Sequence, residues 1–319
     1  MPIGILAGLA TCALWGLTFV APRAVAPFSA FDLTIARYSV FGLACAVAML
    51  HPRFRPRGLT PSQVTTALLL GGLGYVGYFI SVAFAVQRAG AALPPLIIGL
   101  MPVTLALIAN WRDRSVPWRT LAVPLILIAS GVGLVNWTEI GKARPEAVGS
   151  VVTGVAFATA ALVIWVVYGL VNATAMRAAH PPDGLHWTGL QGIGAAIGSL
   201  LLLPLSSFAP AAAAVEFWRF LGWALLMGVA GSWFATWCWV VASRRLPLAL
   251  ASQLIVAETL FGLSYGFAFE GRWPTYPEWV GTLLQAAGVV LAIAQFTGRA
   301  RTARQALATD GAAPVADAK

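Results

Sequence analysis

The sequence predicts an all-α, polytopic integral membrane protein with ten transmembrane helices, arranged as two five-helix inverted repeats. Three observations lead to this prediction. Of the 319 residues, 59% are hydrophobic and 10% are charged, whereas soluble domains carry roughly 25% charged residues. The apolar residues form long runs, close to the ~20 residues that a helix needs to cross a bilayer. The pattern of these runs repeats along the chain.

Ten apolar runs can be delimited. Strands of a membrane barrel would alternate polar and apolar residues in segments of about ten, so continuous runs favour helices. The predicted spans are 3–21, 32–50, 64–86, 91–110, 120–137, 150–171, 187–204, 219–242, 249–268 and 280–297.

The first five spans are separated by residues that end helices. The first run lacks the basic start of a signal peptide, so we expect it to be retained as a helix that ends before Pro27. Pro52 and Pro61 bracket the loop between the second and third spans, and Pro117 precedes the fifth. The fourth span contains three prolines, Pro94, Pro95 and Pro102, which would interrupt its hydrogen bonds. Such breaks either supply backbone groups to a substrate site or are tolerated kinks.

The second five spans are punctuated in the same way. Pro145 precedes the sixth span, Pro181 and Pro182 separate it from the seventh, Pro210 precedes the eighth and Pro274 the tenth. The polar, Ala-rich residues 298–319 are predicted to be a disordered cytoplasmic tail.

An internal repeat divides the chain. A shift of 157 residues places Gly71 on Gly228, Gly74 on Gly231, Arg88 on Arg245, Asp113 on Glu270 and Pro117 on Pro274. We therefore predict a first repeat over residues 1–140 and a second over 141–297. Because each repeat has five spans, an odd number, the second crosses the membrane in the opposite direction. Inverted repeats of this kind are typical of secondary transporters.

The basic residues predict an orientation and exclude several function classes. With the N-terminus inside, the inner segments hold thirteen Lys and Arg residues against seven outside, which predicts cytoplasmic N- and C-termini. The net charge of +9 is dispersed over short loops, so we expect no nucleic-acid binding. Three cysteines without Cys-x-x-Cys spacing predict small buried side chains. We expect no metal, no cofactor and, without a P-loop, no ATP hydrolysis.

Residues 15–21 read Trp-Gly-Leu-Thr-Phe-Val-Ala, residues 32–37 read Asp-Leu-Thr-Ile-Ala-Arg, and residues 256–261 read Val-Ala-Glu-Thr-Leu-Phe. In these segments the chain resembles a known family, the EamA-type branch of the drug/metabolite transporter superfamily. Residues 15–21 are similar to that family's first-helix pattern, and 32–37 to the start of its second helix. Residues 256–261, 269–271, 281–284 and 287–289 are similar to its closing pattern. Thr259 stands where the family often has Pro. The resemblance implies ten helices in two inverted halves around a central cavity, and transport of amino acids and other metabolites.

Glu258 is the acid predicted to lie deepest in the membrane, about ten residues into the ninth span. An intramembrane charge costs about 2.5–3.5 kcal/mol on insertion scales, so such acids face a cavity or a partner. Glu258 is therefore either a coupling or cation-binding carboxylate or a neutral packing residue. Helical spacing places Gly262 and Tyr265 on the same face.

Aromatic residues with polar neighbours at mid-depth predict a solute cavity; the alternative for each is packing in the core or at an interface. The candidates for substrate binding or coupling are Glu258, Trp15, Thr18, Tyr75, Tyr78, Trp165, Tyr168, Trp237 and Tyr265. Tryptophans near span ends are expected to anchor at the interface: Trp111, Trp118, Trp137, Trp187, Trp218, Trp273 and Trp279. Arg37 is expected to lie at a span end and reach toward water, although it could also meet an anionic substrate.

The sequence therefore predicts a non-enzymatic secondary transporter of the inner membrane, most simply an exporter. The expected substrates are small organic solutes such as amino acids or related metabolites. The expected mechanism is alternating access driven by protons or by exchange. The alternatives are a non-transporting receptor or scaffold and a membrane-embedded enzyme. A small-molecule substrate and the lipid bilayer are the expected partners, and a homodimer is compatible with the sequence.

Overall fold

The computed structural model describes residues 2–90, 92–113, 116–142, 145–176, 178–208, 213–246 and 254–310. Among these residues, every regular element is a helix. Seven helical segments are long and apolar enough to cross a membrane. The apolar stretch Leu93–Ile108 and the helices α10 (Gly184–Leu200) and α14 (Val256–Glu270) match the three remaining predicted spans.

The first half forms the first five spans. Its elements are α1 (Pro2–Gly16), η1 (Leu17–Phe19), α2 (Ala21–Ala24), α3 (Ala30–Ala48), η2 (Pro52–Phe54), α4 (Pro61–Leu69), η3 (Leu70–Tyr75), α5 (Val76–Ala89), α6 (Leu93–Ile98), α7 (Met101–Asp113) and α8 (Trp118–Lys142). Capping boxes start α3, through Ser29 and Asp32, and α4, through Thr60 and Gln63.

The second half forms the other five spans. Its elements are α9 (Pro145–Met176), α10, η4 (Leu203–Leu205), α11 (Ala214–Leu225), η5 (Leu226–Phe234), α12 (Ala235–Arg245), α14 and α15 (Tyr276–Asp310). The helix α15 continues through residues 298–310, which the sequence analysis assigned to a disordered tail. Residues 311–319 lie outside the described part of the chain.

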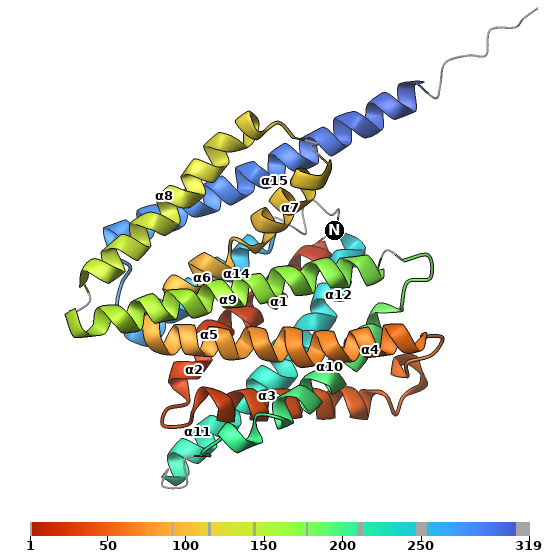
Figure 1. Ribbon diagram of the computed structural model, residues 1–319. Helices are drawn as coiled ribbons and strands as arrows, with labels where there is room; N and C mark the ends of the chain where they lie inside the picture. The colour runs from red at the N-terminus through yellow and green to blue at the C-terminus, as the bar shows by residue number, and fades with distance from the viewer. Residues whose placement is uncertain are drawn as a thin grey trace, which may run out of the picture.

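The two halves pack through contacts that occur in matching pairs. Helix α1 packs on α12 and α14, and its counterpart α9 packs on α5 and α6. Helix α3 packs on its own counterpart α10, and α8 on its counterpart α15, which lie side by side along one edge of the bundle (Figure 1). This is the arrangement expected of inverted halves related by a pseudo-two-fold axis.

A π-helical segment interrupts the third helix of each half. These segments, η3 and η5, fall on each other under the shift of 157 residues. Each lets its helix approach the other half closely: a Cβ on Gly71 would lie 1.9 Å from the Gln191 carbonyl oxygen, and one on Gly228 would lie 2.6 Å from Val40. Such π-helical insertions occur frequently at functional sites.

The fourth span is broken, as its prolines predict. Helix α6 ends at Ile98 and α7 begins at Met101. Side chains of the second half satisfy carbonyls left free near the break: Gln285 donates to the Leu96 oxygen at 2.6 Å, and Thr259 to the Pro95 oxygen at 3.4 Å. Irregular backbone at membrane depth is tolerated where the protein supplies such partners.

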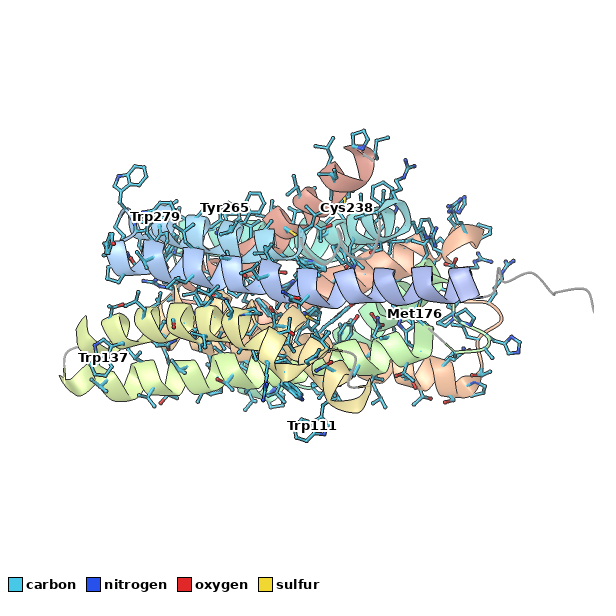
Figure 2. All side chains as sticks on the ribbon, turned by 90° about the horizontal axis from the view of Figure 1, so that it is seen from above. Trp111, Trp137, Met176, Cys238, Tyr265 and Trp279 are labelled. Carbon is cyan, nitrogen blue, oxygen red and sulfur yellow. The ribbon has the colours of Figure 1, made fainter. Side chains whose placement is uncertain are left out.

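Most of the predicted interfacial tryptophans are exposed. Trp111 and Trp279 point away from the bundle (Figure 2), and Trp118, Trp137, Trp218 and Trp273 also lie on the surface. Trp187 differs from the prediction: it is buried, and its indole donates to Asn172 Oδ1 at 2.7 Å. Its place near a span end suggested an anchor, but a polar partner inside the bundle satisfies its N–H. Cys12, Cys45 and Cys238 are buried and free, as predicted.

Candidate functional site

A small central cavity of about 50 Å³ lies between the two halves. Six different spans contribute side chains that carry a polar group or an aromatic ring. The lining residues are Trp15, Thr18, Arg37, Tyr38, Phe41, Tyr75, Tyr78, Trp165, Gly231, Ser232, Thr236 and Glu258. Both π segments reach the cavity, η3 through Tyr75 and η5 through Gly231 and Ser232. A solute bound here would therefore contact both repeats at once.

One wall of the cavity is a stack of three aromatic rings. The indole of Trp165 on α9 lies between Tyr78, at 4.6 Å and 28°, and Tyr168, at 4.5 Å and 5°. Tyr75 closes the wall with its ring 5.9 Å from Trp165 and 5.2 Å from Tyr168. Stacked rings present a flat, rigid face, which suits an apolar or aromatic part of a solute.

Hydrogen bonds behind this wall fix its position. Gln191 Oε1 accepts from the Tyr75 hydroxyl at 2.7 Å and from the Tyr168 hydroxyl at 3.0 Å. The amide nitrogen of Gln191 donates to Asn172 Oδ1 at 3.2 Å. The same oxygen accepts the hydrogen bond from the Trp187 indole. A connected and satisfied polar network of this kind rigidifies the side chains that it joins.

Arg37 on α3 is the cation of the cavity. Its side chain is 7% exposed, so the expectation that it lies at a span end and reaches water is wrong. Nε donates to Ser232 Oγ at 3.1 Å, and Nη1 to Thr18 Oγ1 at 3.5 Å. The guanidinium carbon lies 4.3 Å from the centroid of Phe79 and 5.2 Å from that of Tyr38. Helix α3 begins at Ala30, which places Arg37 two turns inside the helix rather than at its end.

Glu258 is the acid of the cavity and comes from the second half. It lies in the first turn of α14, which begins at Val256. Among the described residues, its carboxylate has no hydrogen bond or ion pair within the chain. The N-terminus of a helix carries a partial positive charge that favours a carboxylate there. The cavity thus holds one positive and one negative side chain from different halves.

Six of the nine predicted candidates line the central cavity: Trp15, Thr18, Tyr75, Tyr78, Trp165 and Glu258. Tyr168 stands one layer behind, in the aromatic stack. Trp237 lines a neighbouring groove, and Tyr265 packs on Phe261 at 5.9 Å without reaching the cavity. Gly262, predicted on the Glu258 face, packs against Phe19.

Sequence reasoning did not include Arg37, Tyr38 or Phe41 among the candidates. The signal for Arg37 was its charge within an apolar run, which is rare unless it faces a cavity. Tyr38 and Phe41 carried no comparable signal, since aromatic residues are common in apolar spans.

A side groove of about 30 Å³ adjoins the central cavity and shares Thr236 with it. It runs between α3, α10 and α12, past Cys45 and Trp237, toward Met49 and Phe54. The end of the bundle that carries Arg53 and Asp183 is therefore the nearer opening. We call it the Arg53 end; it lies at the right of Figure 1, with α4 and α12.

Polar contacts between the halves close the opposite end, which we call the Glu270 end. Arg23 of the first half forms an ion pair with Glu270 of the second. The Asp32 carboxylate accepts hydrogen bonds from the backbone N–H groups of Ser207 and Phe208, both at 3.0 Å. These contacts join loops that would have to separate if the cavity opened here.

Arg272 extends the same network. It bonds to Glu278 at 2.7 and 2.8 Å and to Glu270 at 2.7 Å. The hydrogen bonds to Glu278, above all, raise the pKa of the Arg272 guanidinium above its ordinary value, against the effect of burial. Against the effect of burial, hydrogen bonds from the arginines hold the pKa of Glu270 and of Glu278 below the ordinary value, so the network stays charged at neutral pH.

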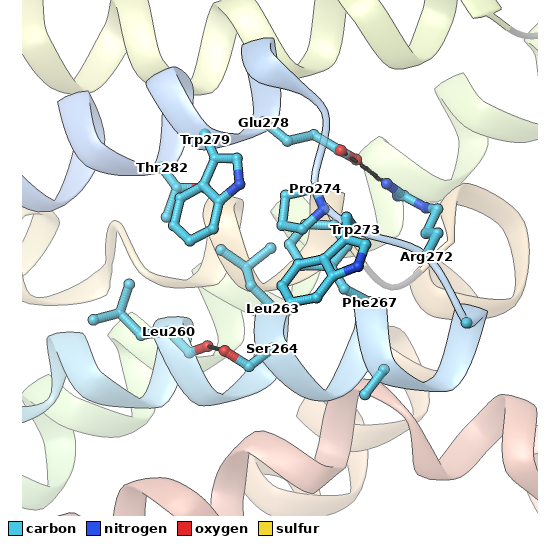
Figure 3. A pocket seen from close by; sticks show the side chains of 12 residues that line it. Leu260, Leu263, Ser264, Phe267, Arg272, Trp273, Pro274, Glu278, Trp279 and Thr282 are labelled. Carbon is cyan, nitrogen blue, oxygen red and sulfur yellow. Dashed lines mark hydrogen bonds and ion pairs between the residues drawn. The ribbon is translucent and has the colours of Figure 1, made fainter.

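A larger groove of about 460 Å³ lies between α14 and α15, away from the central cavity. Figure 3 shows Leu260, Leu263 and Phe267 on its floor and Trp273 and Trp279 over it. None of the nine candidates lines it. Trp273 is 87% exposed, so this groove faces the surroundings of the bundle. Its size alone does not make it the transport site. Among the described residues, no cluster of His, Cys, Asp and Glu could hold a metal ion.

Comparisons with known proteins agree with this architecture. The family model described as "EamA-like transporter family" matches residues 2–137 and 152–294, one copy in each half. Inner membrane protein YtfF of Escherichia coli (strain K12) is 31% identical over 312 residues, which cover 91% of this chain and 94% of that protein. A solved structure, described only as "Crystal structure of protein", shares the fold with a TM-score of 0.59. It is 20% identical, and the match covers 91% of this chain and 96% of that one. The chain belongs to the EamA-like transporter family, a polytopic branch of the drug/metabolite transporter superfamily.

Proposed function

We propose that this chain is a secondary transporter of the inner membrane that exports small organic solutes, such as amino acids or related metabolites, by alternating access. The observation that carries the proposal is the central cavity, which both halves line and which holds Arg37 and Glu258. A rocking motion of one half against the other would expose this cavity to each side in turn. The contacts at the Glu270 end would then break as those at the Arg53 end form.

Glu258 is the candidate for coupling to protons, with exchange of solutes as the alternative driving force. An acid in a cavity between two gates can take a proton from one side and release it on the other. The purified protein in proteoliposomes should take up members of a mixed metabolite panel, followed by mass spectrometry with and without a pH gradient. Uptake of one chemical class that responds to the gradient supports both parts of the proposal. A folded preparation that moves nothing in the panel contradicts it.

Glu258→Gln tests the coupling role directly. We expect this variant to fold and to lose either transport or its response to the gradient. Glu216→Gln is the matched control, because Glu216 also lies in the first turn of a helix, α11, but is only partly buried and does not line the cavity. Wild-type rates and pH dependence in Glu258→Gln would exclude proton coupling through this residue.

Two further parts of the proposal, the cytoplasmic termini and the homodimer, have their own tests. With cytoplasmic termini, a cytoplasm-active reporter fused after Lys319 should work, and a periplasm-dependent one should not. A homodimer should give twice the mass of one chain in nanodiscs.

The chain is proposed to catalyse no reaction: Glu258 is the one acid among the cavity residues, whereas an enzyme would need paired catalytic groups.

A further inference from the structure

Arg37 carries a positive charge that the described part of the chain does not neutralise. The ion pairs there join Arg23, Arg244 and Arg272 to acids, and no carboxylate lies within 4.0 Å of the Arg37 guanidinium. The side chain is nevertheless buried at the depth of the central cavity. A buried charge without an opposite partner is costly, and in membrane proteins such residues mark substrate pathways.

The hydrogen bonds of Arg37 leave part of its guanidinium available. An arginine has five N–H donors, and two of them reach Ser232 and Thr18, which are neutral acceptors. Nη2 has no acceptor among the described residues. In that part of the chain, every side-chain nitrogen or oxygen that is sealed from solvent has a hydrogen-bond partner, except Gln285 Oε1. Since Nη2 has no partner, it is not sealed. Nη2 is therefore open to the cavity.

The surroundings of Arg37 hold it in a fixed orientation. Phe79 and Tyr38 lie against the guanidinium, and Ser232 fixes Nε from the other half. A guanidinium held in this way offers its free N–H groups as a planar fork that matches the two oxygens of a carboxylate. A lysine at this position would keep the charge but lose the fork.

Glu258 provides the complementary charge. It lines the same cavity from α14, and its carboxylate has no partner among the described residues. We propose that the central cavity binds a zwitterionic solute, with the solute's carboxylate on Arg37 and its ammonium group on Glu258. The wall formed by Tyr78 and Trp165 would receive the rest of the solute. This inference rests on the proposed transport function. It adds the charge pattern of the substrate and assigns Arg37 as the residue that binds the substrate's carboxylate.

The volume of the cavity implies a conformational change on binding. Ligand pockets usually measure ~300 Å³ or more, and this one measures about 50 Å³. The adjoining side groove shares Thr236 with the cavity, so widening along that groove would admit the solute. A zwitterion that binds Arg37 and Glu258 would join the first half to the second.

The test uses three matched sets of probes on the full-length protein in nanodiscs. The zwitterions are L-phenylalanine, L-leucine and L-methionine; the amines are their decarboxylated analogues, and the acids are their deaminated analogues. Compounds retained from an equimolar mixture are counted by mass spectrometry. We expect at least one zwitterion to be retained about ten- to a hundredfold more than its amine and its acid, the effect of losing one charge-assisted contact.

Arg37→Gln should remove the preference for the zwitterion over the amine, and Arg37→Lys should restore part of it. Ser232→Ala, which removes the acceptor for Nε and a local hydrogen bond to the Met227 carbonyl, serves if Arg37 variants do not fold, and should weaken the same preference. Arg88→Gln is the matched control: Arg88 also lies over two rings, Phe84 and Phe157, but outside the cavity. It should leave the preference unchanged.

Three outcomes would overturn the inference. Equal retention of zwitterion and amine would show that Arg37 does not bind the solute's carboxylate. An unchanged preference in Arg37→Gln would show the same. Retention of none of the nine probes would exclude this class of zwitterion. Transport of another solute in the metabolite panel would still leave the proposed function in place, so the two failures can be told apart.

Discussion

The Gln191 carbonyl oxygen lies so close to Gly71 that a Cβ on this glycine would be 1.9 Å away. The contact joins the π segment η3 of the first half to α10 of the second. It is backbone against backbone, so no side-chain rotation can relieve an added methyl group. The Gln191 side chain accepts a hydrogen bond from Tyr75, which lies four positions after Gly71. The contact between Gly71 and Gln191 therefore also positions the aromatic wall.

Gly71→Ala should therefore destabilise the protein by more than the about 1–3 kcal/mol of ordinary overpacking. The expected result is loss of the folded protein from detergent extracts, measured by fluorescence-detected size-exclusion chromatography. Gly133→Ala is the control, because a Cβ at Gly133 on α8 has no atom within 4 Å. A monodisperse Gly71→Ala protein with wild-type thermal stability would contradict this packing.

Gln285 should contribute to stability through the broken fourth span. Its amide donates to the Leu96 carbonyl at 2.6 Å in a buried position. Gln285→Leu leaves that oxygen unpaired, which should cost ~1–3 kcal/mol and lower the midpoint of thermal unfolding. Gln87→Leu is the comparison, because Gln87 makes a longer bond of 3.4 Å to Pro22 from an exposed position. Equal effects of the two substitutions would contradict the role of Gln285.

Trp165 should be needed for transport because it is the middle ring of the stack. Trp165→Ala removes two stacked contacts, each worth about 0.5–1.5 kcal/mol beyond area burial, and leaves Tyr78 without support. We expect loss of solute retention and a lower unfolding midpoint, with partial recovery of both in Trp165→Phe. Trp218→Ala, on the exposed surface, should affect neither measurement. Full solute retention in Trp165→Ala would show that the wall does not contact the solute.

The Arg23–Glu270 pair should keep the Glu270 end closed. Thr18 lines the cavity and is 4% exposed, so a cysteine there in a background without native cysteines reports on opening. Glu270→Gln should increase its labelling by a membrane-impermeant thiol reagent. High salt should do the same in the wild-type background, because a partly exposed pair is screened.

Arg244→Gln is the control for this experiment, since Arg244 forms a looser, exposed pair with Asp183 at the opposite end, at 3.9 Å. Unchanged labelling in Glu270→Gln would mean that the backbone contacts of Asp32 hold this end closed without the ion pair.

The sequence was sufficient to predict the ten spans and the inverted repeat, because hydropathy and repeated Gly, Pro and Arg positions are local signals. It also singled out Glu258 and most of the aromatic wall, which lie in or beside the central cavity; their role in binding stays a prediction. It misplaced Arg37, because a two-residue error in the start of the second span moves a charge from the cavity to the interface. It treated Trp187 as an anchor, because the partner Asn172 lies on another helix and only the fold brings them together. The amino-acid sequences of the π segments η3 and η5 do not differ in any recognisable way from those of ordinary glycine-rich helices.

The opposite charges of Arg37 and Glu258 have a consequence for how membrane voltage acts on the carrier. Moving one elementary charge through the membrane potential requires ~2.3 kcal/mol per 100 mV. A zwitterion carries no net charge, so loading the solute by itself leaves the net charge of the cavity unchanged. Voltage would then neither drive nor oppose the passage of the solute itself. Any electrical current that accompanies transport would then be carried by the coupled protons alone.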